Sequence, residues 1–202
     1  MSYTVREIFH SLQGEGVQAG RAAVFLRFSG CNLWSGRQED RAKAVCRFCD
    51  TDFVGGVKYS DAQSLAEAVK AVGGSTRYVV VTGGEPGLQL DETLIHALHG
   101  LGFSVAVETN GTLGLPSGLD WVCVSPKAGT ELMVTRGDEL KLVFPQDGAA
   151  PEAFEHLDFA HFLLQPMDGP DRAANTAAAI AHCLTHPRWR LSLQTHKIVG
   201  IP

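Results

Sequence analysis

Short β-branched or apolar runs alternate along this chain with segments of helical periodicity, and this alternation restricts the fold more than any other feature. The runs predict strands at 22–28, 77–82, 104–108, 121–125, 139–144 and 161–165, with a further one at 189–194. The helical segments lie at 60–73, 91–101 and 171–185. Because strands that alternate with helices form a mostly parallel sheet, the pattern predicts an α/β fold with about six strands and about three main helices.

The length of the chain narrows the architecture within that class. A complete eight-fold β/α barrel usually needs about 250 residues, and this chain has 202. We therefore expect an incomplete (partial) TIM-like β/α barrel. The sequence contains no internal repeat and no shift in composition that would mark a linker, so residues 1–202 are predicted to form a single domain.

Composition and charge exclude several classes of protein. Hydrophobic residues make up 45% of the chain and charged residues 19%, which is ordinary for a globular protein and excludes a disordered one. The formal net charge of −5 argues against a dedicated nucleic-acid-binding protein. No apolar run approaches the roughly 20 residues that span a bilayer, and the first residues lack a signal-peptide core. We expect a cytoplasmic protein that binds neither nucleic acid nor membrane.

The first predicted helix carries start and stop signals. Ser60 is expected to cap it, because Gln63 three residues later completes a capping box. Val72 is expected on the apolar face, and Gly73 is typical of a helix end.

A long irregular stretch at 29–59 separates the first strand from the first helix and carries three of the five cysteines. Loops of this length inside a compact domain are usually functional or disordered. Fourteen residues separate Cys31 from Cys46, and two separate Cys46 from Cys49. Three thiolates are one short of a closed zinc site and one short of a fully thiolate-ligated 4Fe–4S cluster. The spacing alone leaves an iron–sulfur cluster, a zinc ion and plain structural thiols open. The other two cysteines are expected to be small buried residues.

Polar residues gather directly after several predicted strands, where parallel α/β folds carry their active sites. The clearest case is the turn Thr82-Gly83-Gly84-Glu85-Pro86. Paired glycines let the backbone approach a ligand closely, and Glu85 adds an acceptor. A lone Gly-Gly pair would indicate only a turn from a strand into a helix. Combined with a three-cysteine loop after the first strand, it predicts a site for a cofactor.

These two features together resemble the radical S-adenosylmethionine (SAM) superfamily, whose members hold a 4Fe–4S cluster with three cysteines after the first strand of a partial or full barrel. They bind SAM at a Gly-Gly-Glu-Pro segment after the second strand. The insertion at 32–45 departs from the common C-x3-C-x2-C spacing and indicates a subgroup. The segments IFHSLQGEG at 8–16 and FLRFSGC at 25–31, with Cys49-Asp50-Thr51, resemble the 7-carboxy-7-deazaguanine synthases, a family in the pathway to 7-deazapurines such as queuosine.

The resemblance implies roles for residues around the cofactor. Cys31, Cys46 and Cys49 would ligate three irons of the 4Fe–4S cluster and leave the fourth iron open for SAM. Thr51 would ligate Mg²⁺ through its hydroxyl, although a hydroxyl beside aspartates also fits an ordinary turn. Without the resemblance, we would interpret most of the remaining positions as ordinary polar residues in the loops that follow strands. The positions implied to bind SAM are Phe48, Cys49, Asp50, Gly84, Glu85, Ser125, Pro126, Lys127, Gln165, Pro166, Met167 and Asp168.

The same resemblance implies a small-molecule substrate, 6-carboxy-5,6,7,8-tetrahydropterin. Arg27 would bind its carboxylate, because a guanidinium forms bidentate pairs with carboxylates. An arginine in a buried strand needs an anionic partner in any case, so an internal salt bridge fits equally well. Backbone and amide groups would hold the pterin ring. The positions implied to bind substrate, besides Arg27, are Leu12, Gln13, Gly14, Glu15, Thr82, Glu108, His196 and Pro202.

The end of the chain is expected to take part in binding. The sequence stops at Gly200-Ile201-Pro202, and a terminal segment is usually frayed unless something holds it. In the resembled family the chain end folds over the substrate, so the Pro202 carboxylate would accept charge-assisted hydrogen bonds from the pterin. His196 would help to close the cavity. The alternative is a tail that is ordered but idle.

The resemblance also implies the reaction. An external one-electron reductant, such as flavodoxin or ferredoxin, would reduce the cluster, which then cleaves SAM to methionine and a 5′-deoxyadenosyl radical. The radical takes a hydrogen from C6 of the pterin, the ring contracts, and loss of ammonia gives 7-carboxy-7-deazaguanine. A homodimer is expected. Two alternatives are a glycyl-radical activating enzyme that acts on a protein substrate, against which Arg27 argues, and a non-enzymatic zinc module.

Overall fold

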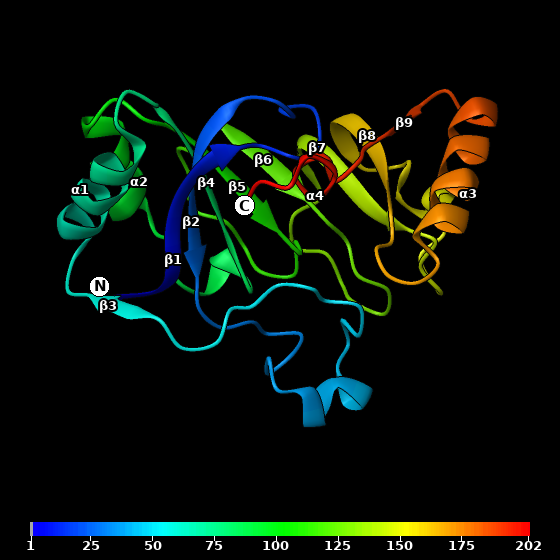
Figure 1. The fold of residues 1–202 in the computed structure, drawn as a ribbon, viewed down its shortest axis with the longest axis horizontal. Coiled ribbons are helices and arrows are strands. Elements are labelled where there is room, and N and C mark those ends of the chain that lie inside the picture. Colours follow the sequence, from blue (N-terminus) through cyan, green and yellow to red (C-terminus); the bar gives the residue numbers. More distant parts are fainter. Residues whose placement is uncertain (1) are drawn as a thin grey trace.

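The computed structural model describes residues 2–202, and its nine strands form one open sheet (Figure 1). β1 is antiparallel to both of its neighbours, and every pairing from β2 onward is parallel. The partial, mostly parallel barrel predicted from the sequence is thereby confirmed. In sheet order the strands are β3 (Val57–Tyr59), β1 (Tyr3–Leu12), β2 (Ala22–Phe28), β4 (Tyr78–Gly83), β5 (Ser104–Thr109), β6 (Trp121–Val124), β7 (Arg136–Phe144), β8 (Asp158–Pro166) and β9 (Trp189–Leu191).

Three helices pack on the outer face of the sheet, α1 (Ala62–Gly73) and α2 (Glu92–Gly100) toward one edge and α3 (Arg172–Thr185) toward the other (Figure 1). A fourth, α4 (Thr195–Val199), lies with the C-terminus over the middle of the sheet. Short 3₁₀ turns occur at Gln38–Lys43, Pro86–Leu88 and Pro151–Phe154. Across residues 2–202, every helix is too short or too polar to span a bilayer.

The two faces of the sheet are built from alternate residues of each strand. On the outer face, Val81 and Val107 belong to a core shared with α1 and α2, and Leu142 belongs to a second core shared with α3. On the inner face, a small apolar layer that includes Val80 and Ala106 fills the floor of the partial barrel. The residues beyond this layer, at the carboxyl ends of the strands, are polar. The alternation therefore places polar side chains around an inner space.

The start of α1 corrects the sequence-based expectation. Asp61, not Ser60, is the N-cap, and its Oδ1 accepts a hydrogen bond from the Ser64 backbone N–H at 2.8 Å. An aspartate is as good a cap as a serine, and here it stands one residue closer to the helix. Val72, expected on the buried face, is 40% exposed, since the apolar stripe of α1 faces inward through Leu65 and Val69.

Three elements of the structure were not predicted from the sequence: β1, β3 and α4. β1 is half-buried and carries charged residues, so it lacks the apolar run that marked the other strands. β3 has three residues, which is too short for a periodic signal. The last strand, predicted to reach residue 194, ends at Leu191 and is followed by α4.

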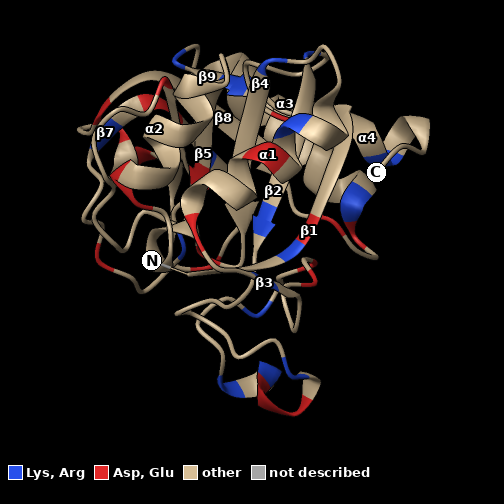
Figure 2. Ribbon diagram, turned by 90° about the vertical axis from the view of Figure 1, so that its left-hand side faces the viewer, with Lys and Arg blue, Asp and Glu red and all other residues tan. Residues whose placement is uncertain are grey.

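The stretch at 29–59 leaves the sheet as an extended loop that projects from the body of the molecule (Figure 2). Its outermost part is the 3₁₀ turn Gln38–Lys43, which carries charges of both signs. Near the base of the loop, Trp34 packs edge-on against the buried Phe53, with ring centroids 5.6 Å apart. This aromatic contact fixes the inserted segment against the segment that returns to β3.

Candidate active site

A cavity of about 400 Å³ opens at the carboxyl ends of the parallel strands. The structure brings almost all of the predicted ligand-binding residues to its wall, and the exceptions are Glu85 and Pro126. The predicted residues that line the cavity are Leu12, Gln13, Gly14, Glu15, Arg27, Cys31, Cys46, Phe48, Cys49, Asp50, Thr51, Thr82, Gly84, Glu108, Ser125, Lys127, Gln165, Pro166, Met167, Asp168, His196 and Pro202.

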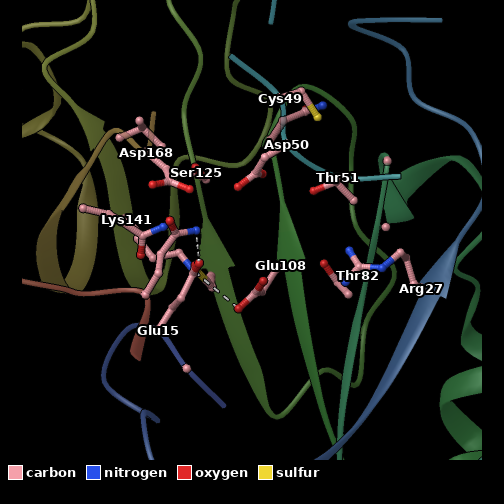
Figure 3. A pocket seen from close by; sticks show the side chains of 18 of the residues that line it. Glu15, Arg27, Cys49, Asp50, Thr51, Thr82, Glu108, Ser125, Lys141 and Asp168 are labelled. Atoms are coloured by element: carbon pink, nitrogen blue, oxygen red, sulfur yellow. Dashed lines mark hydrogen bonds and ion pairs between the residues drawn. The ribbon is translucent and has the colours of Figure 1, made fainter. Parts of the chain in front are cut away.

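The wall divides into two groups of side chains, which Figure 3 shows above and below the centre of the cavity. The group near the cysteine loop, called the loop side below, contains Cys49, Asp50, Thr51, Ser125 and Asp168. The group deeper in the partial barrel, called the strand side below, contains Glu15, Arg27, Thr82, Glu108 and Lys141.

The three clustered cysteines are free thiols that share the loop side. Their sulfur atoms do not all lie within 4.8 Å of one another. Thiolates around a tetrahedral zinc ion, each about 2.3 Å from the metal, would lie about 3.8 Å apart. The three cysteines offer thiolates to one common space, as either kind of metal centre requires.

Hydrogen bonding between two of these thiols prepares one of them to bind metal. The Cys46 thiol donates to the sulfur of Cys49, and this bond, against the opposing effect of burial, lowers the pKa of Cys49 to about 6. The same bond and burial raise the pKa of Cys46. Burial also raises the pKa of Cys31, although the Leu33 backbone N–H donates to its sulfur at 3.4 Å. Since the thiolate is the metal ligand, Cys49 is the thiol most ready to coordinate.

An arginine from the inserted segment braces the Cys46–Cys49 turn. One terminal nitrogen of Arg41 donates to the carbonyl oxygens of Arg47 at 2.8 Å and Cys49 at 3.0 Å. The guanidinium also stacks over the Trp34 ring, 4.0 Å from its centroid. The insertion therefore supports the turn that carries two of the three cysteines.

The glycine turn after β4 brings two backbone segments into direct contact. A Cβ atom on Gly84 would lie 2.0 Å from the carbonyl oxygen of Gly30, so no larger residue fits there. The Glu85 backbone N–H donates to the same carbonyl at 2.9 Å. The turn thus holds the residue before Cys31 against the cavity wall, which explains the paired glycines.

Glu85 and Pro126 are the two predicted cofactor-binding residues that do not line the cavity, and both are buried behind its wall. The Glu85 carboxylate accepts hydrogen bonds from the Thr109 hydroxyl at 2.7 Å and from the backbone N–H groups of Gly87 and Asn110, each at 2.8 Å. It fixes the turn after β5 and presents no acceptor to a ligand. The Pro126 carbonyl accepts a hydrogen bond from Gln146.

Polar groups after β6 and β8 complete the loop side. The Lys127 side chain folds toward Ser125. Its ammonium donates to the Ser125 carbonyl at 2.6 Å and to the Ser125 hydroxyl at 2.7 Å. Burial lowers the pKa of Lys127, while the nearby Cys46 sulfur opposes this. Gln165 lies at the end of β8, and its side-chain oxygen accepts a hydrogen bond from Ser192 at 3.2 Å.

The strand side contains a connected network of amides, carboxylates and one lysine. Gln13 donates to Oε1 of Glu108 at 2.9 Å, and Gln194 donates to Oε1 of Glu15 at 2.8 Å. The Lys141 ammonium lies 2.5 Å from Oε2 of Glu15 and 3.4 Å from Oε1 of Glu108. These side chains come from the loop after β1, from β5, from β7 and from the segment before α4, so the network joins four parts of the chain.

Arg27 forms an ion pair on its own sheet and also faces the cavity. Its Nε lies 2.7 Å from Oε1 of Glu7 on the adjacent strand, which is the expected internal salt bridge. Its side chain also lines the cavity, and within residues 2–202 neither terminal nitrogen has a hydrogen-bond partner. The guanidinium is therefore oriented by one carboxylate and open to another.

The C-terminal segment closes the mouth of the cavity. The Thr195 backbone N–H and hydroxyl donate to the Gly14 carbonyl at 2.8 and 2.9 Å. The His196 ring occupies the space that a Cβ atom on Gly14 would need. The Ser11 hydroxyl donates to the carbonyl oxygen of Pro202 at 2.7 Å. The tail is held in place along the end of β1.

Lys197 connects this tail to the loop side. Its ammonium lies 2.6 Å from Oδ2 of Asp50 and 2.7 Å from Oδ2 of Asp168. The Lys197 hydrogen bond lowers the pKa of Asp168. Asp52, on the other side of Thr51, pairs with Arg6 at 2.6 Å. Each aspartate beside Thr51 therefore already holds a cationic side chain.

The sequence analysis missed Lys141 and Lys197. The signal for Lys141 was present: Glu139 and Lys141 alternate with leucines in an inner strand, which places two charged side chains on the ligand face. No comparable signal existed for Lys197, because its partners depend on how the tail docks.

Comparisons with known proteins agree with this geometry. The model of the Radical SAM superfamily matches residues 41–141. Over the full length of both chains, the sequence is 64% identical to the 7-carboxy-7-deazaguanine synthase of Bordetella pertussis, and 64% identical to the protein of the same name from Caulobacter vibrioides.

Solved structures give the same picture. The crystal structure of QueE from Escherichia coli superposes with a TM-score of 0.76 at 30% sequence identity. The match covers 97% of this chain and 95% of that chain. Fold and sequence are therefore similar over nearly their entire lengths.

Proposed function

Because this chain belongs to the 7-carboxy-7-deazaguanine synthase family of radical SAM enzymes, we propose that its substrate is 6-carboxy-5,6,7,8-tetrahydropterin and that the reaction releases ammonia. Residues 1–202 would act as one domain. The observation that carries the proposal is a single cavity that joins three free cysteines on the loop side to a dense set of hydrogen-bonding groups on the strand side.

The loop side fits the 4Fe–4S cluster and SAM that the family implies. Cys31, Cys46 and Cys49 face the same space as free thiols. Three thiolates leave one iron open for SAM. When bound, the cluster and SAM supply the carbon-centred radical that takes a hydrogen from C6 of the pterin.

The remaining loop-side residues would hold SAM. Gly84 exposes backbone groups to the cavity, and the Lys127 ammonium suits the SAM carboxylate. Backbone and side-chain groups from three other segments would orient the adenine and ribose. These residues are Phe48, Cys49, Asp50, Ser125, Gln165, Pro166, Met167 and Asp168.

The strand side would bind the pterin ring. The side-chain amide of Gln13 is already used, because it donates to Glu108 and accepts from the Glu15 backbone N–H at 3.2 Å. We therefore assign ring contacts to the backbone of Leu12–Gly14 and to the Glu15 and Glu108 carboxylates, with His196 and the Pro202 carboxylate closing over the ring.

Arg27 would bind the substrate carboxylate. Glu7 holds its Nε, so the two terminal nitrogens remain to form a bidentate pair. Thr82 lies beside Arg27 in the register of β2 and β4 and can donate its hydroxyl to the same carboxylate. A charged end and a donor-rich ring are the two features by which this cavity would recognise the pterin.

The Thr51 hydroxyl is the proposed ligand for Mg²⁺. This ion prefers oxygen ligands and keeps several waters, so one protein hydroxyl together with substrate oxygens would be enough to place it. Asp50 and Asp52 are the competing oxygen donors, and each is already paired with a basic side chain.

The reaction also needs a partner for electron transfer. One electron must enter the cluster, so we propose an external one-electron reductant such as flavodoxin or ferredoxin. A homodimer is proposed from the family alone.

The test is an anaerobic assay of the iron-reconstituted protein with the pterin, SAM and a one-electron reductant, without any partner protein. We expect 7-carboxy-7-deazaguanine and one equivalent of ammonia. A protein that leaves the pterin unchanged but modifies a glycine in a partner polypeptide would be a glycyl-radical activating enzyme, which would overturn the proposal.

A further inference from the structure

Lys141 is buried between two carboxylates on the strand side, and the proposed function assigns it no contact with a ligand. We propose that Lys141 is a positioning residue that keeps Glu15 ionised and holds it beside Glu108, so that the N–H groups of the bound pterin meet two carboxylate acceptors. This inference rests on the proposed function, because the pterin supplies the N–H groups.

The geometry gives Lys141 this role directly. Its side chain is only 5% exposed, and its ammonium contacts Oε2 of Glu15 and Oε1 of Glu108. Gln194 and Gln13 hold the same two carboxylates from their other sides. Each carboxylate is thus fixed by one amide and by the shared lysine (Figure 3).

Both carboxylates keep room for a ligand. A carboxylate can accept about four hydrogen bonds, and within residues 2–202 Oε2 of Glu108 accepts none. Two carboxylates and one ammonium leave one net negative charge in this part of the cavity. That charge favours a donor edge, such as the amino and ring N–H groups of an aminopyrimidinone, and disfavours an edge built of oxygen acceptors.

The lysine offsets the repulsion between the two carboxylates, because its ammonium contacts both of them. Burial by itself raises the pKa of Glu15, but the Lys141 ammonium and hydrogen bonds outweigh burial and lower it to about 2. Burial by itself lowers the pKa of Lys141, and the Glu108 and Glu15 carboxylates outweigh it and raise that pKa. Without the cation, one carboxylate would take up a proton and become a donor.

Other ionisable groups face this network from neighbouring elements. Glu139 lies on β7, the strand that carries Lys141, and its carboxylate accepts a hydrogen bond from the Val17 backbone N–H at 2.8 Å. The others are Arg27 on β2, which is paired with Glu7, Cys123 on β6, Tyr78 on β4, Lys127 after β6 and His196 on α4. All of them are unchanged in the variants below, so differences between those variants report on Lys141.

The test compares K141M, which removes the charge, with K141R, which keeps it. Binding of the pterin to the reconstituted, SAM-loaded enzyme is measured by anaerobic calorimetry without reductant, between about pH 6 and pH 9. At about pH 7, K141M should bind the pterin roughly 10- to 100-fold more weakly, the loss expected when hydrogen bonds to a charged group are removed. K141R should stay within a few-fold of wild type. Removal of the exposed Lys58 in K58M is the matched control.

The pH dependence separates this role from a purely structural one. In K141M a protonated Glu15 carboxyl is a weaker acceptor than the carboxylate and also carries an O–H donor, so pterin affinity should rise with pH across that range and approach wild type at the upper end. Affinity for SAM should be the same in K141M, K141R and wild type. Equal losses of pterin and SAM affinity in K141M, without any pH dependence, would show that Lys141 only supports the fold, and the inference would be wrong.

A second variant covers the case in which K141M does not fold. E15Q/K141M removes the cation and one carboxylate together, so the net charge of the network is unchanged, and pterin binding should still be weak because a neutral amide oxygen replaces the charged Glu15 acceptor. Wild-type pterin affinity in either variant overturns the inference. A wild-type enzyme that does not bind the pterin at all would instead overturn the proposed function.

Discussion

Single lysines connect parts of this cavity that lie far apart in the sequence. Lys141 joins the end of β1 to β5, and Lys197 joins the C-terminal tail to Asp50 and Asp168. A lysine ammonium carries three donors, so one side chain can hold two carboxylates at once. In both cases the lysine fixes residues that we assign to ligand binding.

At the same scale, the metal proposal predicts a specific loss in T51A. This variant should keep its iron content and its basal turnover but lose stimulation by Mg²⁺, because the flanking aspartates are already paired with Lys197 and Arg6. Product formation is measured across a Mg²⁺ titration, with T185A at the far end of α3 as the control. Undiminished stimulation of T51A by Mg²⁺ would show that Thr51 is not a ligand of the ion.

Individual residues also show which features of the site cannot be predicted from the sequence alone. The sequence placed Glu85 and Lys127 in the same class of polar residues after a strand, yet one is buried behind the wall and the other lines the cavity. The difference arises because Glu85 meets three donors from two turns, and only tertiary structure brings those donors together.

Among the elements, α1 offers a test that does not depend on function. Asp61 caps the helix through the Ser64 N–H, whereas the Ser60 hydroxyl only donates to the Asp61 carboxylate at 2.7 Å. D61A should therefore lower the free energy of unfolding by about 1 kcal/mol, and S60A should change it by less than about 0.5 kcal/mol. Urea unfolding of both variants gives the comparison. If S60A lowered the free energy of unfolding more than D61A does, Ser60 would be the N-cap, as expected from the sequence.

The C-terminal tail is the second element with a defined role. Deletion of Ile201 and Pro202, or extension of the chain with a C-terminal tag, should raise KM for the pterin at least about 10-fold, because the charge-assisted hydrogen bonds that the pterin donates to the Pro202 carboxylate are lost. SAM binding should not change. An N-terminal tag is the control. Wild-type kinetics in the C-terminally tagged protein would show that the tail is ordered but idle.

Elements differ in how well the sequence predicts them, for a physical reason. β4 to β8 are inner strands with apolar runs, so local pattern was sufficient. β1 has one strongly buried half and one half that faces the cavity and the solvent, which breaks the pattern. α4 has five residues and is held by Gly14, a contact that the local sequence does not encode.

On the scale of the whole molecule, the open sheet explains why the tail and the cysteine loop are needed. A closed barrel would bury its inner face by itself, but here β3 and β9 remain at opposite edges. The segment at 29–59 and the C-terminal residues cover the space that closure would have enclosed, and Lys197 joins the two. Chain length predicted the open architecture, and the rule that ligands bind at the carboxyl ends of strands predicted the position of the cavity.

The central claim is that Cys31, Cys46 and Cys49 build an iron–sulfur centre that opens into this cavity and supports conversion of the pterin. The most direct measurement compares wild type, C46A and C183A after anaerobic reconstitution, by iron content, by absorbance and by formation of 7-carboxy-7-deazaguanine. Cys183 lies on α3 and is a matched control, because it is away from the cavity. We expect wild type and C183A to carry the cluster and form product, and C46A to do neither. Full turnover by C46A, or a colourless wild-type protein that holds zinc, would contradict the account.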